Sequence, residues 1–315
     1  MTRSNPFKLS VVVPCYNEGA HLKDFINTLK STVESLTNHY EIILINDGSK
    51  DNTKEVIYSL IASGHIRYLE FSRNFGKEAA LMAGIDHASG DATLLIDADF
   101  QHPLEKITEM ADLWKSGYEM IYGVIVTRSG DSVGKRIGTR LLYKLLNTSD
   151  ITIPENAGDF RWLDYKVVCA LKNLPERNRF MKGLYAWVGF KSIAIPFEPK
   201  KRESGKSAFS LGRLIKLGLV GLTSFTAAPL QLWIGIGALI SLLAIIYGAY
   251  VIADTVIYGN AVSGWPTLTV ALMLFSGIQL LSISILGEYI GRIFTEVKQR
   301  PLYVISEDLT SSEST

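Results

Sequence analysis

Short apolar runs alternate with helix-like repeats over the first two hundred residues. Apolar or β-branched runs predict buried strands at 9–13, 40–46, 66–71 and 93–97. Between these runs, apolar residues recur at helical spacing, as in the segment that carries Leu22, Phe25, Ile26, Leu29 and Val33. Strands alternating with helices indicate an α/β fold, with a mostly parallel sheet and helices on both faces.

The pattern continues less regularly after residue 100. A helix is predicted near 107–114, a strand at 120–126, a helix ending near 174 and a last short strand at 193–197. Asp51 is expected to be the N-cap of the helix after the second strand. Asp159 and Asp164 are separated by four residues on a possible helix, and Asp164 is expected to be a structural cap.

Two later segments differ sharply from this soluble pattern. Residues 230–253 and 267–287 contain no charged side chain. Each is about 20 residues or longer, enough for a helix to cross a hydrocarbon core of ~30 Å. We therefore expect two transmembrane helices, and two buried core helices are the alternative.

Basic residues indicate how these helices are oriented. Lysines and arginines precede the first span and follow the second, while the connecting loop at 254–265 has none. The positive-inside rule then places both termini and the large domain in the cytoplasm. The stretch before the first span mixes basic and apolar residues, as in an interfacial amphipathic helix. The expected division is 1–205 for the α/β domain, 206–228 for the amphipathic segment, 229–291 for the helical hairpin and 292–315 for a polar tail.

Charge, cysteine content and the first loop narrow the class of protein. The net charge of +1 gives no sign of nucleic-acid binding. Cys15 and Cys169 are far apart, which disfavours a zinc site or a disulfide framework. The loop at 14–18 is not glycine-rich, and no P-loop motif is present. A nicotinamide-binding protein and a P-loop phosphoryl transferase are both disfavoured.

Acidic residues stand at the ends of successive strands: Glu18, Asp47, Asp97 and Asp99. In an open α/β sheet, strand ends of this kind meet at the ligand-binding rim. Asp97, Asp99 and Gln101 share one face if the strand continues through them. Three oxygen donors of this kind suit Mg²⁺ or Mn²⁺. The alternative is that the two aspartates only cap the helix that opens near Pro103.

The motifs around these residues resemble a known enzyme family. Three motifs are similar to those of family-two inverting glycosyltransferases with the GT-A (Rossmann-like) fold: 11–18, 46–51 and 97–103. Three more resemble the polyprenyl-phosphate group within that family, which includes dolichol-phosphate mannose synthases and bacterial bactoprenol glucosyltransferases: 73–78, 158–161 and 201–207. The resemblance is greatest to the bacterial glucosyltransferases.

The resemblance implies a metal-dependent hexosyltransferase. It would transfer a hexose, with UDP-glucose as the favoured donor, to undecaprenyl phosphate with inversion, at the cytoplasmic face of the bacterial plasma membrane. A mannosyl- or aminosugar transferase, a processive polymer synthase, and a non-catalytic membrane scaffold or flippase partner are the alternatives. The bilayer is an expected partner and nucleic acid is not. The glycines of the spans permit close helix packing, so we expect a homo-oligomer.

The resemblance also implies roles for individual residues. The nucleotide sugar would contact Pro14, Tyr16, Asn17, Glu18, Asp47, Lys77, Asp97 and Ala98. The metal would be held by Asp97, Asp99 and Gln101, with Asp99 and Asp159 as the catalytic residues. The acceptor phosphate would be bound by Arg128, Arg202, Lys206 and Ser207.

Asp159 stands where the family has its proposed base, but the ionisation of the acceptor argues against a need for a base. A phosphate monoester with a second pKa near 6 is already largely ionised at neutral pH, so a strong base is not required. We therefore hypothesise that Asp159 positions the acceptor. Other residues have structural alternatives: an ion pair with a lysine for Glu18, a turn for Asp47, a buried strand-end histidine for His102 and contacts with lipid headgroups for Arg202 and Lys206.

Overall fold

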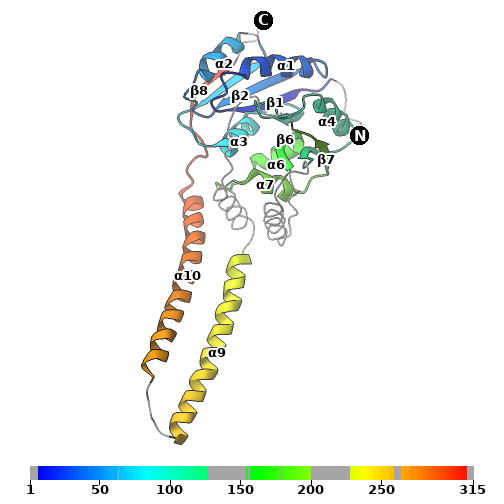
Figure 1. Ribbon diagram of the computed structural model, residues 1–315. Coiled ribbons are helices and arrows are strands. Elements are labelled where there is room, and N and C mark those ends of the chain that lie inside the picture. The colour runs from blue at the N-terminus through cyan, green and yellow to red at the C-terminus, as the bar shows by residue number, and fades with distance from the viewer. Residues whose placement is uncertain are drawn as a thin grey trace.

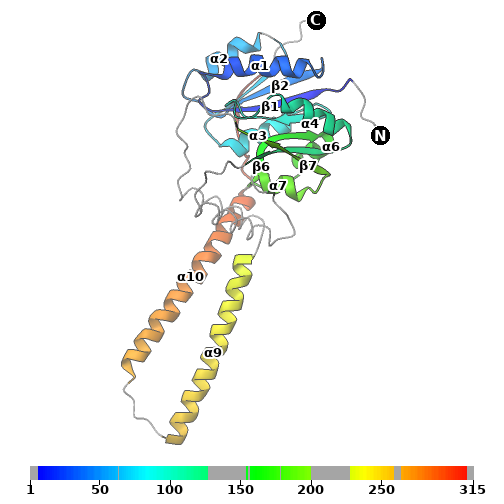
Figure 2. The same ribbon diagram turned by 45° about the vertical axis from the view of Figure 1, so that its right-hand side comes forward.

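The computed structural model has an α/β domain from which two long helices project (Figures 1 and 2). It describes residues 6–62, 64–126, 154, 157–177, 179–199, 228–258 and 264–310. The first described strand (Leu9–Cys15) and the last (Ile305–Thr310) both belong to the sheet of the α/β domain, so the helical hairpin projects from this domain between them.

The α/β domain is built on an eight-stranded sheet in the order β7-β5-β6-β4-β1-β2-β3-β8. Strands β4, β1, β2 and β3 are parallel neighbours, whereas β6 runs antiparallel to both β4 and β5. The strands are β1 (Leu9–Cys15), β2 (Tyr40–Asn46), β3 (Ile66–Phe71), β4 (Ala92–Leu95), β5 (Met120–Ile125), β6 (Ala157–Asp164), β7 (Ser192–Phe197) and β8 (Ile305–Thr310). The α/β class and the mostly parallel sheet are confirmed.

Helices cover both faces of the sheet, as the alternating pattern predicts. One core contains side chains of α1 (Leu22–Glu34), α2 (Thr53–Ile61) and α4 (Lys106–Lys115). The other contains side chains of α3 (Lys77–His87), α6 (Tyr165–Lys172) and α7 (Met181–Trp187). Strand β1 serves both cores, because Val11 and Val13 point to the first and Val12 to the second.

Helix α3 lies unusually close to the centre of the sheet. A Cβ atom added at Gly84 would stand only 2.1 Å from Cγ1 of Val12. This contact leaves no room for a side chain at position 84 unless Val12 moves. The glycine therefore sets how near α3, which begins with Lys77, comes to β1.

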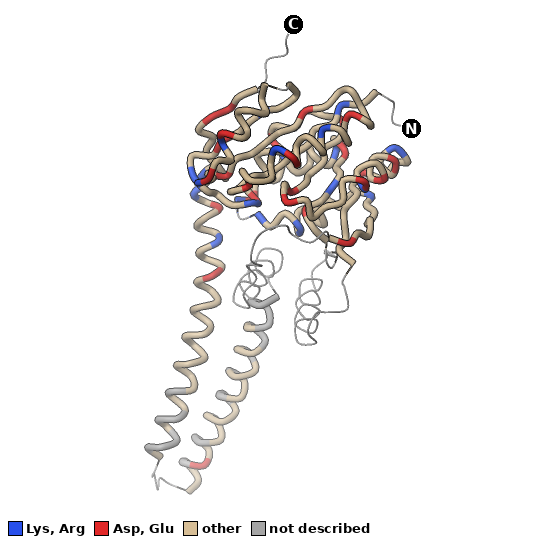
Figure 3. Tube along the Cα trace, turned by 45° about the horizontal axis from the view of Figure 1, so that its top comes forward, with Lys and Arg blue, Asp and Glu red and all other residues tan. Residues whose placement is uncertain are grey.

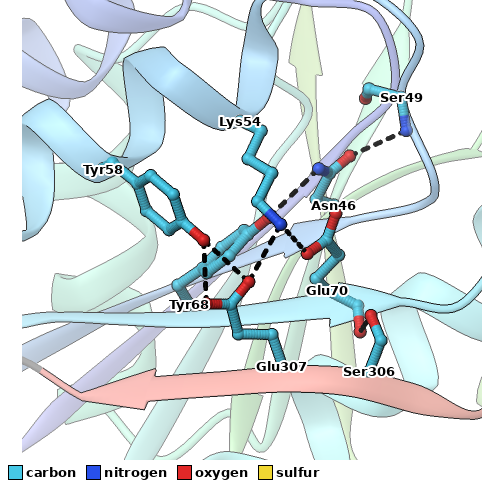
Figure 4. Close-up of polar contacts among 8 residues, drawn as sticks. All are labelled: Asn46, Ser49, Lys54, Tyr58, Tyr68, Glu70, Ser306 and Glu307. Carbon is cyan, nitrogen blue, oxygen red and sulfur yellow. Dashed lines mark hydrogen bonds and ion pairs between the residues drawn. The ribbon is translucent and has the colours of Figure 1, made fainter.

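The sequence pattern does not predict the last strand, β8. The sequence predicts a polar tail for 292–315, whereas residues 305–310 pair antiparallel with β3 and close that edge of the sheet. Figure 4 shows the polar cluster that holds β8: Glu307 accepts from Lys54 Nζ at 3.0 Å and from the Tyr58 hydroxyl at 2.7 Å. Arg67 and Asp308 form a second pair, at 2.8 Å. The polar residues of this segment are partners of β3 and α2.

Two long helices, α9 (Ala228–Tyr258) and α10 (Trp265–Lys298), lie side by side as a hairpin in both views. Trp233 of α9 donates a hydrogen bond to the Ser282 hydroxyl of α10. Among the described residues, one stretch, Leu274–Lys298, is long and apolar enough to cross a membrane. Figure 3 shows charged residues concentrated in the α/β domain and the adjoining end of α10. A second span in α9 stays a prediction.

Four local predictions need correction. The N-cap of α2 is Asn52, although the Asp51 carboxylate does accept from the Thr53 N–H at 3.1 Å. Strand β4 ends at Leu95 and does not reach Asp97. Residues 157–164 form β6, not a helix, and Asp164 then caps α6 as expected by accepting from Lys166 N at 3.0 Å. Helix α10 continues to Lys298, beyond the expected end of the hairpin at 291.

Candidate active site

A cavity of about 270 Å³ opens at the carboxyl ends of β1, β2 and β4. Its position matches the switch point of the sheet, because β1 is flanked by β2 on one side and by β4 on the other. Its lining residues are Pro14, Cys15, Tyr16, Glu18, Asp47, Asn74, Gly76, Lys77, Ala80, Asp97, Ala98 and Asp99. Every residue predicted for the nucleotide sugar except Asn17 is among them.

Asn17 instead joins two loops beside the cavity. Its backbone has a left-handed conformation, with φ of 58°. Its side-chain oxygen accepts from Lys50 N at 2.8 Å, and its own N–H donates to the Ser49 hydroxyl at 3.0 Å. The loop after β1 is thereby fixed to the loop after β2, which supports the cavity wall.

Asp47 lines the cavity and binds the backbone of a neighbouring loop. Its buried carboxylate accepts from Phe75 N at 2.6 Å and from Gly76 N at 2.9 Å. Burial raises its pKa, and the two backbone donors oppose that shift. The next residue, Gly48, has φ of 65°, and a Cβ there would be 2.7 Å from the backbone of Arg73. Asp47 is therefore more than a turn residue, because it holds the loop that leads into α3.

Lys77 joins the two acidic parts of the site. Its ammonium nitrogen lies 2.8 Å from Oδ2 of Asp97 and 2.8 Å from Oδ2 of Asp159. Partial burial alone would lower the Lys77 pKa, but the two carboxylates outweigh it and hold that pKa above its ordinary value. Burial alone would raise the pKa of Asp97, yet contacts with His102 and Lys77 hold it well below its usual range. The cluster is thus a lysine held between two carboxylates.

Asp159 reaches this cluster from β6. Arg161 pairs with Leu95, the last residue of β4, so Asp159 lies beyond the end of β4, beside the loop that carries Asp97. The Oδ1 atom of Asp159 is buried and has no hydrogen-bond partner among the described residues. One oxygen of this carboxylate is therefore committed to Lys77, and the other is available to a ligand.

His102 supports Asp97 from the opposite side. It is 8% exposed and its ring stacks on Phe160 at 4.9 Å. Its Nε2 atom stands 3.4 Å from Oδ2 of Asp97, a long contact. These contacts favour the structural interpretation of His102 over a ligand role.

The predicted metal ligands do not share one strand face. Strand β4 has ended, and Phe100 has φ of 56°, which breaks the extended alternation. Asp97 and Asp99 line the cavity, but Gln101 does not, and its N–H donates to Asp99 Oδ1 at 3.1 Å. In the part of the chain that the structure describes, no group of three or more His, Cys, Asp or Glu residues is arranged to hold a metal ion. Two carboxylates in the cavity still offer the hard oxygen donors that Mg²⁺ or Mn²⁺ prefers.

Several features of the site were not predicted. Glu78, next to Lys77, is half-buried and accepts from Met181 N at 3.0 Å. Burial, together with the nearby charge of Asp159, raises the pKa of Glu78 to about 7. The motif at 73–78 singled out this segment but not the contacts of its side chains. The predicted acceptor-phosphate residues Arg128, Arg202, Lys206 and Ser207 lie outside the described residues.

Comparisons with known proteins give matches over most of the chain. The family model described as Glycosyl transferase family 2 matches residues 10–170, which include every cavity-lining residue and Asp159. An uncharacterized glycosyltransferase of Synechocystis is 43% identical over 302 residues, covering 95% of each chain. A prophage bactoprenol glucosyl transferase homolog of Escherichia coli is 44% identical over 300 residues, covering 95% of this chain and 98% of that protein. The bactoprenol glucosyl transferase of Shigella phage SfII is 44% identical over 302 residues, with the same coverage.

Among solved structures, the chain is similar to glucosyl-3-phosphoglycerate synthase from Mycobacterium tuberculosis in complex with phosphoglyceric acid. The identity is 17%, the TM-score is 0.47, and the match covers 70% of this chain and 80% of that one.

Proposed function

Because this chain belongs to glycosyl transferase family 2, with the GT-A-like α/β fold, we propose that it transfers a hexose to a polyprenyl phosphate. The donor that we favour is UDP-glucose, and the product would be a lipid-linked sugar phosphate with an inverted anomeric centre. Relatives named bactoprenol glucosyl transferase, which match nearly the whole chain, support this choice.

One observation supports the proposal most strongly: Lys77 bridges Asp97 and Asp159. Asp97 lines the cavity expected to hold the donor, whereas Asp159 comes from β6 and has a buried oxygen without a described partner. A transfer reaction needs the donor and the acceptor side by side. Lys77 contacts both Asp97, which is expected to serve the donor, and Asp159, which is expected to serve the acceptor.

The leaving group is a nucleoside diphosphate, on which negative charge develops as the glycosidic bond breaks. The Lys77 ammonium group, at the cavity wall, is suited to stabilise that charge. Asp97 and Asp99 would hold a divalent cation that neutralises the diphosphate. Asp47 and Asn17 keep the loops around the nucleotide in place through their hydrogen bonds.

Asp159 would serve the acceptor. The phosphate oxygen of the acceptor is already ionised near neutral pH, so the reaction needs orientation more than proton removal. Lys77 holds one Asp159 oxygen and thereby fixes the direction of the other. The outer phosphate contacts would come from Arg128, Arg202, Lys206 and Ser207.

The proposed acceptor is a lipid, so a helical hairpin in the membrane would keep the α/β domain close to it. We propose that α9 and α10 both cross the plasma membrane, with the α/β domain and both termini in the cytoplasm and residues 206–228 at the membrane interface. The apolar stretch Leu274–Lys298 and the charges gathered at the domain end of α10 support this orientation. A homo-oligomer is part of the same proposal.

The test is a donor panel. Purified full-length protein is mixed with undecaprenyl phosphate, Mg²⁺ and, in turn, UDP-glucose, GDP-mannose and UDP-N-acetylglucosamine, and the lipid fraction is examined by mass spectrometry. We expect a hexosyl phospholipid with UDP-glucose. A product with another donor alone would overturn the choice of sugar. No glycolipid with any donor would overturn the transferase proposal and favour a non-catalytic scaffold.

A further inference from the structure

A second cavity lies under α7, on the same side of the sheet as Asp159. Its volume is about 130 Å³. It is lined by Met120, Tyr122, Pro154, Arg161, Lys182, Tyr185, Ala186, Gly189, Phe190 and Ser192. None of these lining residues is acidic, and two of them are cationic.

Arg161 is the most unusual residue of this cavity. The residue is only 2% exposed, yet no carboxylate of the described chain lies within ion-pair distance of its guanidinium group. Its Nε donates to Gly158 O at 3.2 Å, and Nη1 contacts the Met120 sulfur at 3.6 Å. Its Nη2 donates to none of the described residues. A buried charge normally has a paired charge or a full set of hydrogen bonds, so this guanidinium group has unused donor capacity.

Tyr185 provides a second unused donor. It is completely buried, and its hydroxyl group has no hydrogen-bond partner among the described residues. Its ring lies against the Arg161 guanidinium group, 4.2 Å from its central carbon. A buried hydroxyl group without a partner destabilises the folded protein, so such a group points to a missing ligand.

The same chemical class of ligand suits Arg161, Tyr185 and Lys182, which all line this cavity. Arginine, lysine and tyrosine all donate hydrogen bonds, and a guanidinium group binds the oxygens of a phosphate two at a time. The cavity is small, which suits a phosphate group better than a nucleoside or a sugar nucleotide. Ser192, at the start of β7, adds a hydroxyl group to the lining.

We propose that this cavity binds a phosphate group through Arg161, Tyr185 and Lys182. It lies next to the reaction site, because Asp159, Arg161 and Leu163 alternate along β6 and share one face of the sheet. The assignment of the phosphate to the polyprenyl acceptor rests on the proposed function. The bound group would then approach Asp159 from the side opposite the donor cavity.

The purely structural alternative is that Arg161 is held only by aromatic rings. The ring of Tyr122 also lies near it, with its centroid 5.1 Å from the central carbon of the guanidinium group. Stacking of this kind requires the ring of Tyr185 but not its hydroxyl group. Tyr185→Phe therefore separates the two explanations, because it keeps the ring and removes only an oxygen that has no partner in the described part of the protein.

The first experiment measures phosphate binding without any reaction. Full-length protein in detergent is titrated with inorganic phosphate, and binding is followed as an increase in melting temperature at constant ionic strength. We expect the wild type to bind and Tyr185→Phe to bind about 10-fold more weakly, since 1.4 kcal/mol corresponds to a factor of ten. Tyr165→Phe, on the exposed surface of α6, is the matched control and should bind like the wild type. Equal affinities for the wild type and Tyr185→Phe, or no binding by either, would overturn the phosphate site.

The second experiment identifies the source of the phosphate. In the glycolipid assay, we expect Tyr185→Phe to raise KM for the polyprenyl phosphate about 10-fold and to leave KM for the sugar nucleotide unchanged. A raised KM for the sugar nucleotide alone would overturn the acceptor assignment. If the wild type makes no glycolipid but binds inorganic phosphate in the first experiment, the proposed function fails and the phosphate site stands.

Discussion

The ammonium group of Lys77 lies 2.8 Å from Oδ2 of Asp159. Lys77 is the first residue of α3, and Asp159 lies on β6, an antiparallel strand that enters the sheet beside β4. The same nitrogen contacts Asp97 at the cavity beside the carboxyl ends of β1, β2 and β4. This one side chain therefore offsets the repulsion between two carboxylates.

Replacing Lys77 tests that relationship. Lys77→Met would leave Asp97 and Asp159 without their shared cation, and we expect kcat to fall about 10²- to 10³-fold, as when a charge-stabilising donor is removed from an active site. Lys77→Arg keeps the charge and should retain more activity. Lys106→Met, which removes a surface ion pair with Glu109, is the control and should leave kcat unchanged. A Lys77→Met enzyme with the kcat of the wild type would contradict the role of the bridge.

Glu78 gives the protein a predictable pH dependence. Its pKa is raised from 4.5 to about 7 by burial and by the charge of Asp159, so the folded state holds this proton more tightly than the unfolded state. The contribution to stability is fully present below about pH 4.5 and is lost as the pH rises through 7. Glu78→Gln should remove this loss, which amounts to about 3–4 kcal/mol at most.

The measurement for Glu78 is the melting temperature of full-length protein between pH 5 and 8. The wild type should lose stability over this interval more steeply than Glu78→Gln, which still accepts from Met181 N. Glu55→Gln, at an exposed position on α2, is the control and should follow the wild type. Parallel curves for the wild type and Glu78→Gln would show that Glu78 does not titrate there.

The close contact of α3 with β1 predicts a compensating pair of substitutions. Gly84→Ala should destabilise the protein by about 1–3 kcal/mol, because the new methyl group meets Val12. Adding Val12→Ala makes room, so the double variant should be more stable than the sum of the two single losses. Thermal unfolding of the wild type, the two single variants and the double variant gives the coupling free energy between positions 84 and 12. Gly237→Ala, in α9 with nothing within 4 Å of the new Cβ, is the control. Additive losses would mean that the contact is relieved elsewhere.

Strand β8 is predicted to be fastened in part by the cluster in Figure 4. A double-mutant cycle of Lys54→Met and Glu307→Gln should give a coupling of about 0.5–1 kcal/mol in the free energy of unfolding, because both side chains are about one-third exposed. Chain termination after residue 304 should cost far more, since the edge of β3 loses its partner strand and its hydrogen bonds. Equal stability with and without residues 305–315 would contradict a structural role for β8.

The parallel half of the sheet could be predicted from local patterns. Strands β2 and β3 have the predicted bounds, because buried parallel strands are continuous apolar runs and each ends at a polar turn. Most residues that line the cavity with Asp97 follow from the same logic, since the ends of parallel strands meet at one rim. Asn17 is the exception, because its side chain is used between two loops.

The antiparallel elements could not be predicted in this way. The segment with Asp159 and Asp164 reads as a possible helix, and only pairing with β4 and β5 makes it the strand β6. The polar residues of β8 form a strand because Lys54 and Arg67, far away in the sequence, provide their partners. The contacts of Lys77 and the cavity around Arg161 depend on the same long-range pairing.

The most direct test of the account is the kcat of Asp159→Asn. Initial rates of glycolipid formation are measured with saturating UDP-glucose and varied undecaprenyl phosphate, at about pH 7 and about pH 8.5, where the acceptor is a dianion. We expect Asp159→Asn to lose most of kcat at both pH values while KM for the acceptor stays near that of the wild type. Full recovery of kcat at the higher pH alone would identify Asp159 as a base, and an unchanged kcat at both pH values would remove it from the site.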